Sequence, residues 1–199
     1  LGSGVSLQDR GRIGSRRFGV PQGGALDRHS MMAANRLLGN RMDAPVLEIR
    51  QQGTEISILK DTWLAMAGAD SCPILRSWTA KLMRAGDRLV FSESGGGLFS
   101  YLAAPGGWVS DSFLGSVSIN TRSQIGSPIK KGTKLAHRSE SPSFSSDRVA
   151  KRLLVSEERK SYPSALTLEI LPGPQLGDFS KSARRALVDR VWTVSGQSD

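Results

Sequence analysis

The strongest constraint on the fold is a change in hydrophobic period early in the chain. Asp27 precedes a run in which apolar residues such as Ala34 and Leu38 recur at helical spacing, and Gly39 ends the run. An aspartate N-cap and a glycine at the other end are typical helix boundaries, so we predict a helix over 27–38. Beyond it, apolar and polar residues alternate in short segments between glycine-rich turns, which predicts strands.

The predicted strands cover a short stretch around Val5 and Leu7, then 46–50, 54–59, 63–67, 87–91 and 98–104. A hairpin connection is predicted at 51–53, between the second and third of them. One helix beside many short strands predicts a mainly β fold with few helices, a barrel or sandwich with a helix packed on it. Strands and helices do not alternate regularly, which argues against a doubly wound sheet.

Composition divides the chain into three parts: a first subdomain over 1–137, a serine-rich, charged linker or mobile segment over 138–164, and a restart over 165–199. For the last part we predict a strand followed by a rigid turn within 166–175, a helix at about 179–187 capped by Asp178, and a strand at 188–195.

The chain is basic, with a formal net charge of +9 and clusters of Arg and Lys within 10–17 and 130–138. Such charge favours anionic partners, but aromatic residues do not interleave with these clusters, so we do not expect nucleic-acid binding.

No apolar stretch approaches the roughly 20 residues of a membrane span, so no membrane association is expected. The single Cys72 excludes an intrachain disulfide and fits a reducing compartment, which suggests a cytoplasmic protein.

The absence of their sequence motifs excludes several classes of catalytic site. No P-loop, no dinucleotide-binding glycine motif and no nucleophile elbow occurs in the sequence. His29 and His137 have no second ligand at metal spacing, so no metal site is predicted. Cys72 has no identifiable base nearby and is interpreted as a small buried hydrophobe.

The region 8–48 combines glycines with amides, carboxylates and an arginine in a way that packing alone does not require. Such groups can hold a planar amide by paired hydrogen bonds, and glycine allows close approach of the backbone. Structural roles explain several of them equally well, with Asp27 as a helix cap, Asn40 in a turn and Asp9 paired with Arg12. The candidate residues are Gln8, Asp9, Arg12, Gly23, Gly24, Asp27, Asn35, Asn40 and Glu48.

These residues fall in motifs that resemble the carboxyltransferase subdomain C/D family, which includes allophanate hydrolase subunit 2, the C subunit of 5-oxoprolinase and the carboxyltransferase region of urea carboxylase. The matching segments are LQDRGR at 7–12, GVP at 19–21, GGALD at 23–27, ANRLLGN at 34–40 and LE at 47–48. YLA at 101–103 and LPGPQ at 171–175 extend the resemblance along the chain. It implies two cyclophilin-like β-barrel subdomains in tandem, of which the second is incomplete here.

The resemblance also implies a function: ATP-dependent opening of 5-oxoproline, a small cyclic amide, to glutamate. The implied partners are a second cyclophilin-like subunit and, in some members, a third subunit. On this basis Gln8, Asp9, Arg12 and Asp27 are expected to be catalytic, while the substrate-binding residues are expected to be Gly23, Gly24, Asn35, Asn40 and Glu48.

Two alternatives stay open. The same groups would suit carboxyl transfer from carboxybiotin to urea, with the biotin carried on another chain, because no biotin-carrier motif is present. The second alternative is a non-catalytic regulatory partner of a kinase inhibitor. That role needs a binding surface and no turnover.

Overall fold

The computed structural model describes residues 4–50, 53–92, 97–139, 141–142, 151–161 and 167–193. The chain divides into two compact units, Leu1–Pro163 and Ser164–Asp199. Within the described ranges, no helix has both the length and the apolar character needed to cross a bilayer.

The first unit is built on a six-stranded antiparallel sheet with the order β1-β2-β7-β4-β5-β8. Its strands are β1 (Val5–Gln8), β2 (Val46–Arg50), β7 (Phe99–Ala103), β4 (Thr62–Gly68), β5 (Thr79–Met83) and β8 (Lys151–Leu153). A second sheet pairs β3 (Thr54–Ser57) with β6 (Arg88–Phe91). Short 3-10 turns occur at η1 (Ser15–Phe18) and η2 (Ser156–Glu158).

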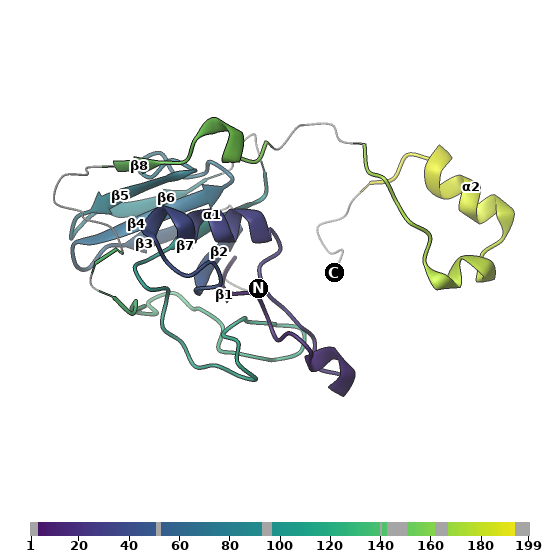
Figure 1. The fold of residues 1–199 in the computed structure, drawn as a ribbon, viewed down its shortest axis with the longest axis horizontal. Helices are drawn as coiled ribbons and strands as arrows, with labels where there is room; N and C mark the ends of the chain where they lie inside the picture. The colour runs from purple at the N-terminus through teal and green to yellow at the C-terminus, as the bar shows by residue number, and fades with distance from the viewer. Residues whose placement is uncertain are drawn as a thin grey trace. The chain divides into compact units, whose positions relative to one another are not determined.

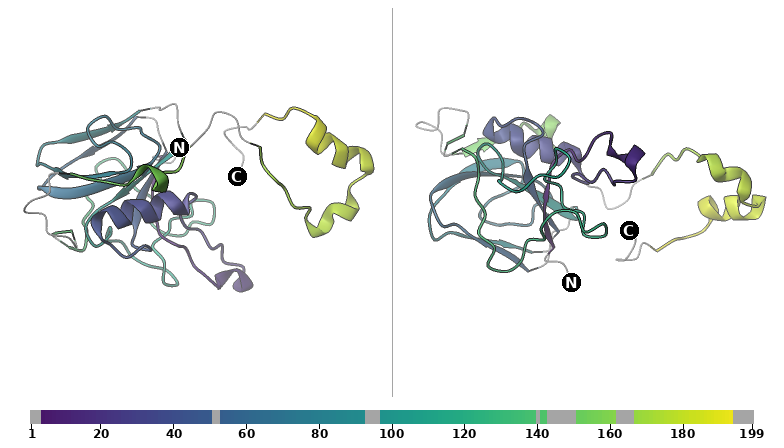
Figure 2. Two further views of the ribbon diagram at one scale, coloured as in Figure 1. Left: turned by 45° about the horizontal axis from the view of Figure 1, so that its top comes forward. Right: turned by 90° about the horizontal axis from the view of Figure 1, so that it is seen from below.

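Both faces of the central strand β4 are buried, each in a different core cluster. In β4, Leu64 and Met66 belong to a core cluster that also contains Phe91 of the small sheet. Ala65 and Ala67 face the other way, toward helix α1 (Arg28–Leu38). Because successive residues of a strand point to opposite faces, the alanines let the helix approach the sheet closely. The helix lies along this face in both sets of views (Figure 1 and Figure 2).

The predicted helix is confirmed, and so are its ends. The Asp27 carboxylate accepts a hydrogen bond from the Ser30 backbone N–H, as an N-cap does. Gly39 adopts φ 70°, and its N–H bonds back to the last turn. The helix then presents Met31, Leu37 and Leu38 to the sheet, all at most 2% exposed.

The predicted strands of the first subdomain are all present, within two residues at their ends. The hairpin predicted at 51–53 is wrong, because β2 pairs with β1 and β7 while β3 pairs with β6; Gln51 and Gln52 themselves lie outside the described residues. The prediction also missed β5 and β8. Since β8 pairs with β5, part of the predicted linker belongs to the sheet, and the first unit extends to Pro163 rather than 137.

The second unit differs from its prediction. Residues 167–173 form no strand, and a 3-10 turn η3 (Pro174–Asp178) and helix α2 (Lys181–Asp189) follow. The helix is capped by Ser180 instead of Asp178, and residues 190–193 are not in a strand. The described part of this unit supplies no strand to pair with, and an unpaired strand would leave its N–H and C=O groups without partners. The incomplete second cyclophilin-like subdomain stays a prediction.

Candidate functional site

Asp9, directly after β1, holds the loop at 116–118 in place. Its Oδ1 accepts hydrogen bonds from Ser116 Oγ and Ser118 Oγ, both at 2.6 Å, and from the Gly11 N–H at 2.7 Å. Its Oδ2 accepts from the Val117 N–H at 2.9 Å. Both carboxylate oxygens of this buried side chain therefore accept hydrogen bonds from the protein, and Asp9 stabilises the conformation of the loop at 116–118.

Arg12 is the least satisfied polar side chain of this region. It is 1% exposed, and its Nη2 donates to the Ser118 carbonyl at 2.5 Å, while Nε and Nη1 have no partner among the described residues. Burial lowers the pKa of the guanidinium, and the nearby charge of Asp9 partly opposes this shift. A buried cation with free N–H groups is costly, so Arg12 is the strongest candidate for contact with a ligand.

Gly23 lies against the Arg12 guanidinium, and Gly24 packs on the backbone of Arg10 and Gly11. The segment is fixed on either side by two backbone hydrogen bonds, from the Arg12 N–H to the Gln22 carbonyl at 2.7 Å and from the Ala25 N–H to the Asp9 carbonyl at 3.0 Å. The structure therefore brings four of the candidate residues together: Asp9, Arg12, Gly23 and Gly24.

Gln8 lies on the opposite side of β1 from the core residue Leu7. Its Nε2 donates to Ser6 Oγ at 2.9 Å and to the Ile119 carbonyl at 3.1 Å, and its buried Oε1 has no partner in the described part of the chain. Ser6 is paired in register with Glu48 on β2, so Gln8 and Glu48 share one face of the sheet.

Glu48 joins the sheet to the start of α1. Its Oε2 accepts hydrogen bonds from the Leu26 N–H at 2.8 Å and from the Tyr101 hydroxyl at 2.9 Å. The Tyr101 hydroxyl in turn accepts from the Asp27 N–H at 2.7 Å. Burial is the main cause that raises the pKa of Glu48, and burial also raises the pKa of Tyr101, which keeps the phenol protonated as a donor.

The raised pKa of Glu48 predicts a pH dependence of stability. The folded protein holds this proton more tightly than the unfolded chain, whose glutamate pKa is about 4.3. The contribution of Glu48 to the unfolding free energy is therefore fully present below that pH and declines as pH rises through the folded pKa. Urea unfolding of Glu48→Gln and wild type across this range should show the decline in the wild type and a flatter profile in the variant.

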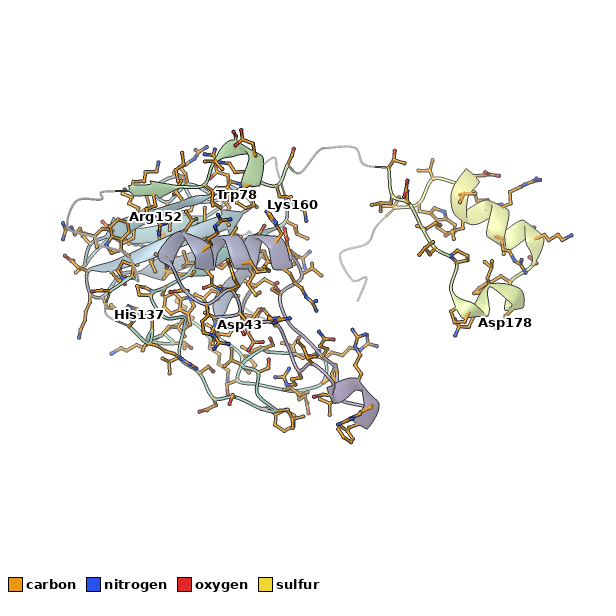
Figure 3. All side chains as sticks on the ribbon, in the orientation of Figure 1. Asp43, Trp78, His137, Arg152, Lys160 and Asp178 are labelled. Atoms are coloured by element: carbon orange, nitrogen blue, oxygen red, sulfur yellow. The ribbon has the colours of Figure 1, made fainter. Side chains whose placement is uncertain are left out.

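Asp27 acts as the helix cap that the sequence predicted. Its Oδ2 accepts a hydrogen bond from Ser30 Oγ at 2.8 Å. Lys160, labelled in Figure 3, places its Nζ 3.5 Å from the same oxygen. Asp27 is thus tied to α1, while its backbone N–H reaches the Tyr101–Glu48 pair.

Replacing Asp27 by alanine should lower the unfolding free energy by about 0.5–2 kcal/mol, the usual cost of losing an N-cap. Thermal unfolding of the variant and of Asp27→Asn, which keeps a capping oxygen, would measure the effect. Equal losses in the two variants would contradict the capping role.

Asn35 and Asn40 use their side-chain amides for hydrogen bonds within the fold. Asn35 Nδ2 donates to the Ala44 carbonyl at 2.8 Å, and Asn35 Oδ1 accepts from Asn40 Nδ2 at 3.0 Å. Asn40 also bonds the Ala104 carbonyl at 2.8 Å and the Gly106 N–H at 2.9 Å. These contacts join the end of α1 to the turn after β7, so the two amides support the fold around the site.

Two open hollows adjoin the Asp9 loop. One, of about 310 Å³, is lined by Asp9, Arg10, Gly11, Ile13, Asp43, Leu114 and Gly115. The other, of about 570 Å³, is lined by Arg10, Arg28, Met31, Met32, Arg41, Met42 and Asp43. No group of three metal-ligating side chains occurs in the described ranges.

Sequence reasoning missed Tyr101, Ser116 and Ser118. The signal for Tyr101 was a phenol within a largely buried strand, since a buried hydroxyl usually has a partner. The signal for the serines was their alternation around Val117, which places both hydroxyls on one side of the segment.

Known proteins resemble this chain in sequence and in structure. The 5-oxoprolinase C subunit of Escherichia coli is 31% identical over 98% of the chain, which spans 63% of that relative. Urea amidolyase of Lachancea kluyveri is 34% identical over 59% of the chain and 7% of that relative. The crystal structure of TTHA0988 superposes with a TM-score of 0.77 and 32% identity, covering 95% of this chain and 69% of that one.

These matches agree with the mainly β fold and are consistent with a cyclophilin-like barrel. A family model described as the carboxyltransferase domain, subdomain A and B, matches residues 18–199. The sequence motifs resemble those of subdomain C/D, so the two descriptions agree on the carboxyltransferase domain and differ in the subdomain. The chain spans less than two thirds of the Escherichia coli relative. By the extent of this match, the chain belongs to the carboxyltransferase domain family.

Proposed function

We propose that this chain belongs to a protein of the same type as the 5-oxoprolinase C subunit, and that it acts in a multi-subunit complex that opens 5-oxoproline to glutamate with ATP. The observation that carries this proposal is the similarity to the Escherichia coli protein along 98% of the chain. The expected partners are a second cyclophilin-like subunit and, as in some members of the family, a third subunit.

The reaction must overcome an unreactive amide. ATP activates an amide by phosphorylating its carbonyl oxygen, which makes attack by water feasible. Among the described residues, the hollow beside Arg10, Arg28 and Arg41 has the charge to suit polyphosphate, so the chain fits a nucleotide there. ATP is assigned to the complex as a whole.

The chain itself offers two kinds of chemistry. Arg12 supplies buried N–H donors that can bind negative charge, and Gln8 Oε1 supplies an acceptor that can take the N–H of a lactam. Glu48 supplies a carboxylate fixed by two donors through Oε2, and its raised pKa makes its ionised form a better proton acceptor from water.

The test is reconstitution of the full-length protein with the subunits encoded beside it. Glutamate and ADP should form together from 5-oxoproline and ATP. A purified, intact complex that forms neither product would contradict the proposal, and a stable complex without turnover would favour the regulatory role.

Carboxyl transfer to urea is the second candidate, because urea amidolyase is 34% identical over 124 residues. In that case biotin would come from another chain. The same complex, given urea and carboxybiotin in place of 5-oxoproline and ATP, separates the two reactions.

A further inference from the structure

We propose that Arg12 binds the carboxylate of the substrate, and that the Gly23–Gly24 segment is a flap that must move for this contact to form. The inference rests on the proposed function, since 5-oxoproline carries a carboxylate beside its lactam. It assigns Arg12 a recognition role that is separate from activation of the amide.

The first argument is the isolation of the guanidinium. Nε carries one N–H and Nη1 carries two, and none of these three donors has a partner among the described residues. Asp9 raises the pKa of Arg12 through its charge, yet its two oxygens accept from Ser116, Ser118 and two backbone N–H groups. Arg12 therefore lacks a carboxylate of its own to bind.

The second argument is what covers Arg12. A Cβ added to Gly23 would lie 3.2 Å from Nη1, so the exposed Gly23 forms a thin cover over those donors. The hydrogen bonds at Gln22 and Ala25 hold the ends of this cover, and the two residues between them are glycines at φ 64° and 99°. Glycine has the widest range of accessible backbone angles, so these two residues are the part of the segment that can change conformation while its ends stay bonded.

The third argument is the chemistry around the guanidinium. Its Cζ lies 5.8 Å from the centre of the Phe113 ring, which is half exposed. A charged donor group beside an apolar ring suits a small ligand with a carboxylate and a saturated ring, and arginine is the side chain best matched to a carboxylate.

The experiment compares 5-oxoproline with 2-pyrrolidinone, which is the same lactam without the carboxylate. Calorimetric titration of each compound into the full complex gives its Kd. Wild type should bind 5-oxoproline about 10- to 100-fold more tightly, and Arg12→Gln should remove that difference while leaving the Kd for 2-pyrrolidinone unchanged. A difference that persists in Arg12→Gln overturns the assignment, as does equal binding of the two compounds by wild type.

A second pair of variants covers the case in which Arg12→Gln does not fold. Gly23→Ala places a methyl group 3.2 Å from Nη1, whereas Gly14→Ala imposes a similar positive φ, 85°, with no atom within 4 Å. Gly23→Ala should weaken 5-oxoproline binding selectively, and Gly14→Ala should not. Equal effects on both ligands would refute the flap.

The outcomes also separate this inference from the proposed function. Turnover of 5-oxoproline without Arg12-dependent discrimination would leave the function standing and reject the role of Arg12. If the complex binds 5-oxoproline more tightly than 2-pyrrolidinone through Arg12 but does not turn it over, the role of Arg12 stands and the proposed function is rejected.

Discussion

Replacing Asp9 by alanine should lower the unfolding free energy by about 3–5 kcal/mol, the cost of removing one partner from a buried charged network. The substitution leaves the hydroxyls of Ser116 and Ser118 and the Val117 N–H without their acceptor. It also removes the negative charge that favours the charged form of the buried Arg12. Urea unfolding followed by circular dichroism would measure the loss.

Asp111→Ala is the matched control, because Asp111 is exposed and has no hydrogen bond or ion pair within the described residues. Its effect should stay within about 0.5 kcal/mol. An Asp9 variant as stable as the control would show that the loop at 116–118 does not depend on this carboxylate. If the expected loss is found, any fall in activity of Asp9→Ala must be corrected for unfolded protein.

Glu48→Gln should lower kcat of the complex by about 10²- to 10⁴-fold, the range found on removing a general base. The folded structure should survive, because the glutamine carbonyl can still accept from the Leu26 N–H and the Tyr101 hydroxyl. Since only ionised Glu48 accepts a proton, wild-type kcat should fall as pH drops through its raised pKa, and the variant should lose this acid limb. Steady-state kinetics with 5-oxoproline across pH would show both effects.

Tyr101→Phe provides the accompanying test of position. The variant loses a hydroxyl that donates to the Glu48 carboxylate and favours its charged form. The pKa of Glu48 should rise further, and the acid limb should move to higher pH with the base still present. An unshifted limb in Tyr101→Phe, or full activity in Glu48→Gln, would remove Glu48 from the reaction.

Most local elements of the first unit follow from the sequence, with β5 and β8 as the exceptions, because each is decided over a few residues. The cap at Asp27, the apolar stripe on α1 and the left-handed Gly39 suffice to define the helix. A short apolar run suffices for β4, which is buried along its whole length. Alternation did not reveal that β2 and β3 belong to different sheets, since strand pairing is a long-range property that the period of one segment does not encode.

The sequence by itself also determined which residues to consider, through motifs that match the carboxyltransferase family. Only the tertiary structure decided what each residue does. Asp9 and Arg12 meet Ser118 more than 100 positions away, so neither the occupied carboxylate nor the free guanidinium could be predicted from spacing. A polar group is available to a ligand only when the fold leaves it without a partner, and that depends on contacts between distant segments.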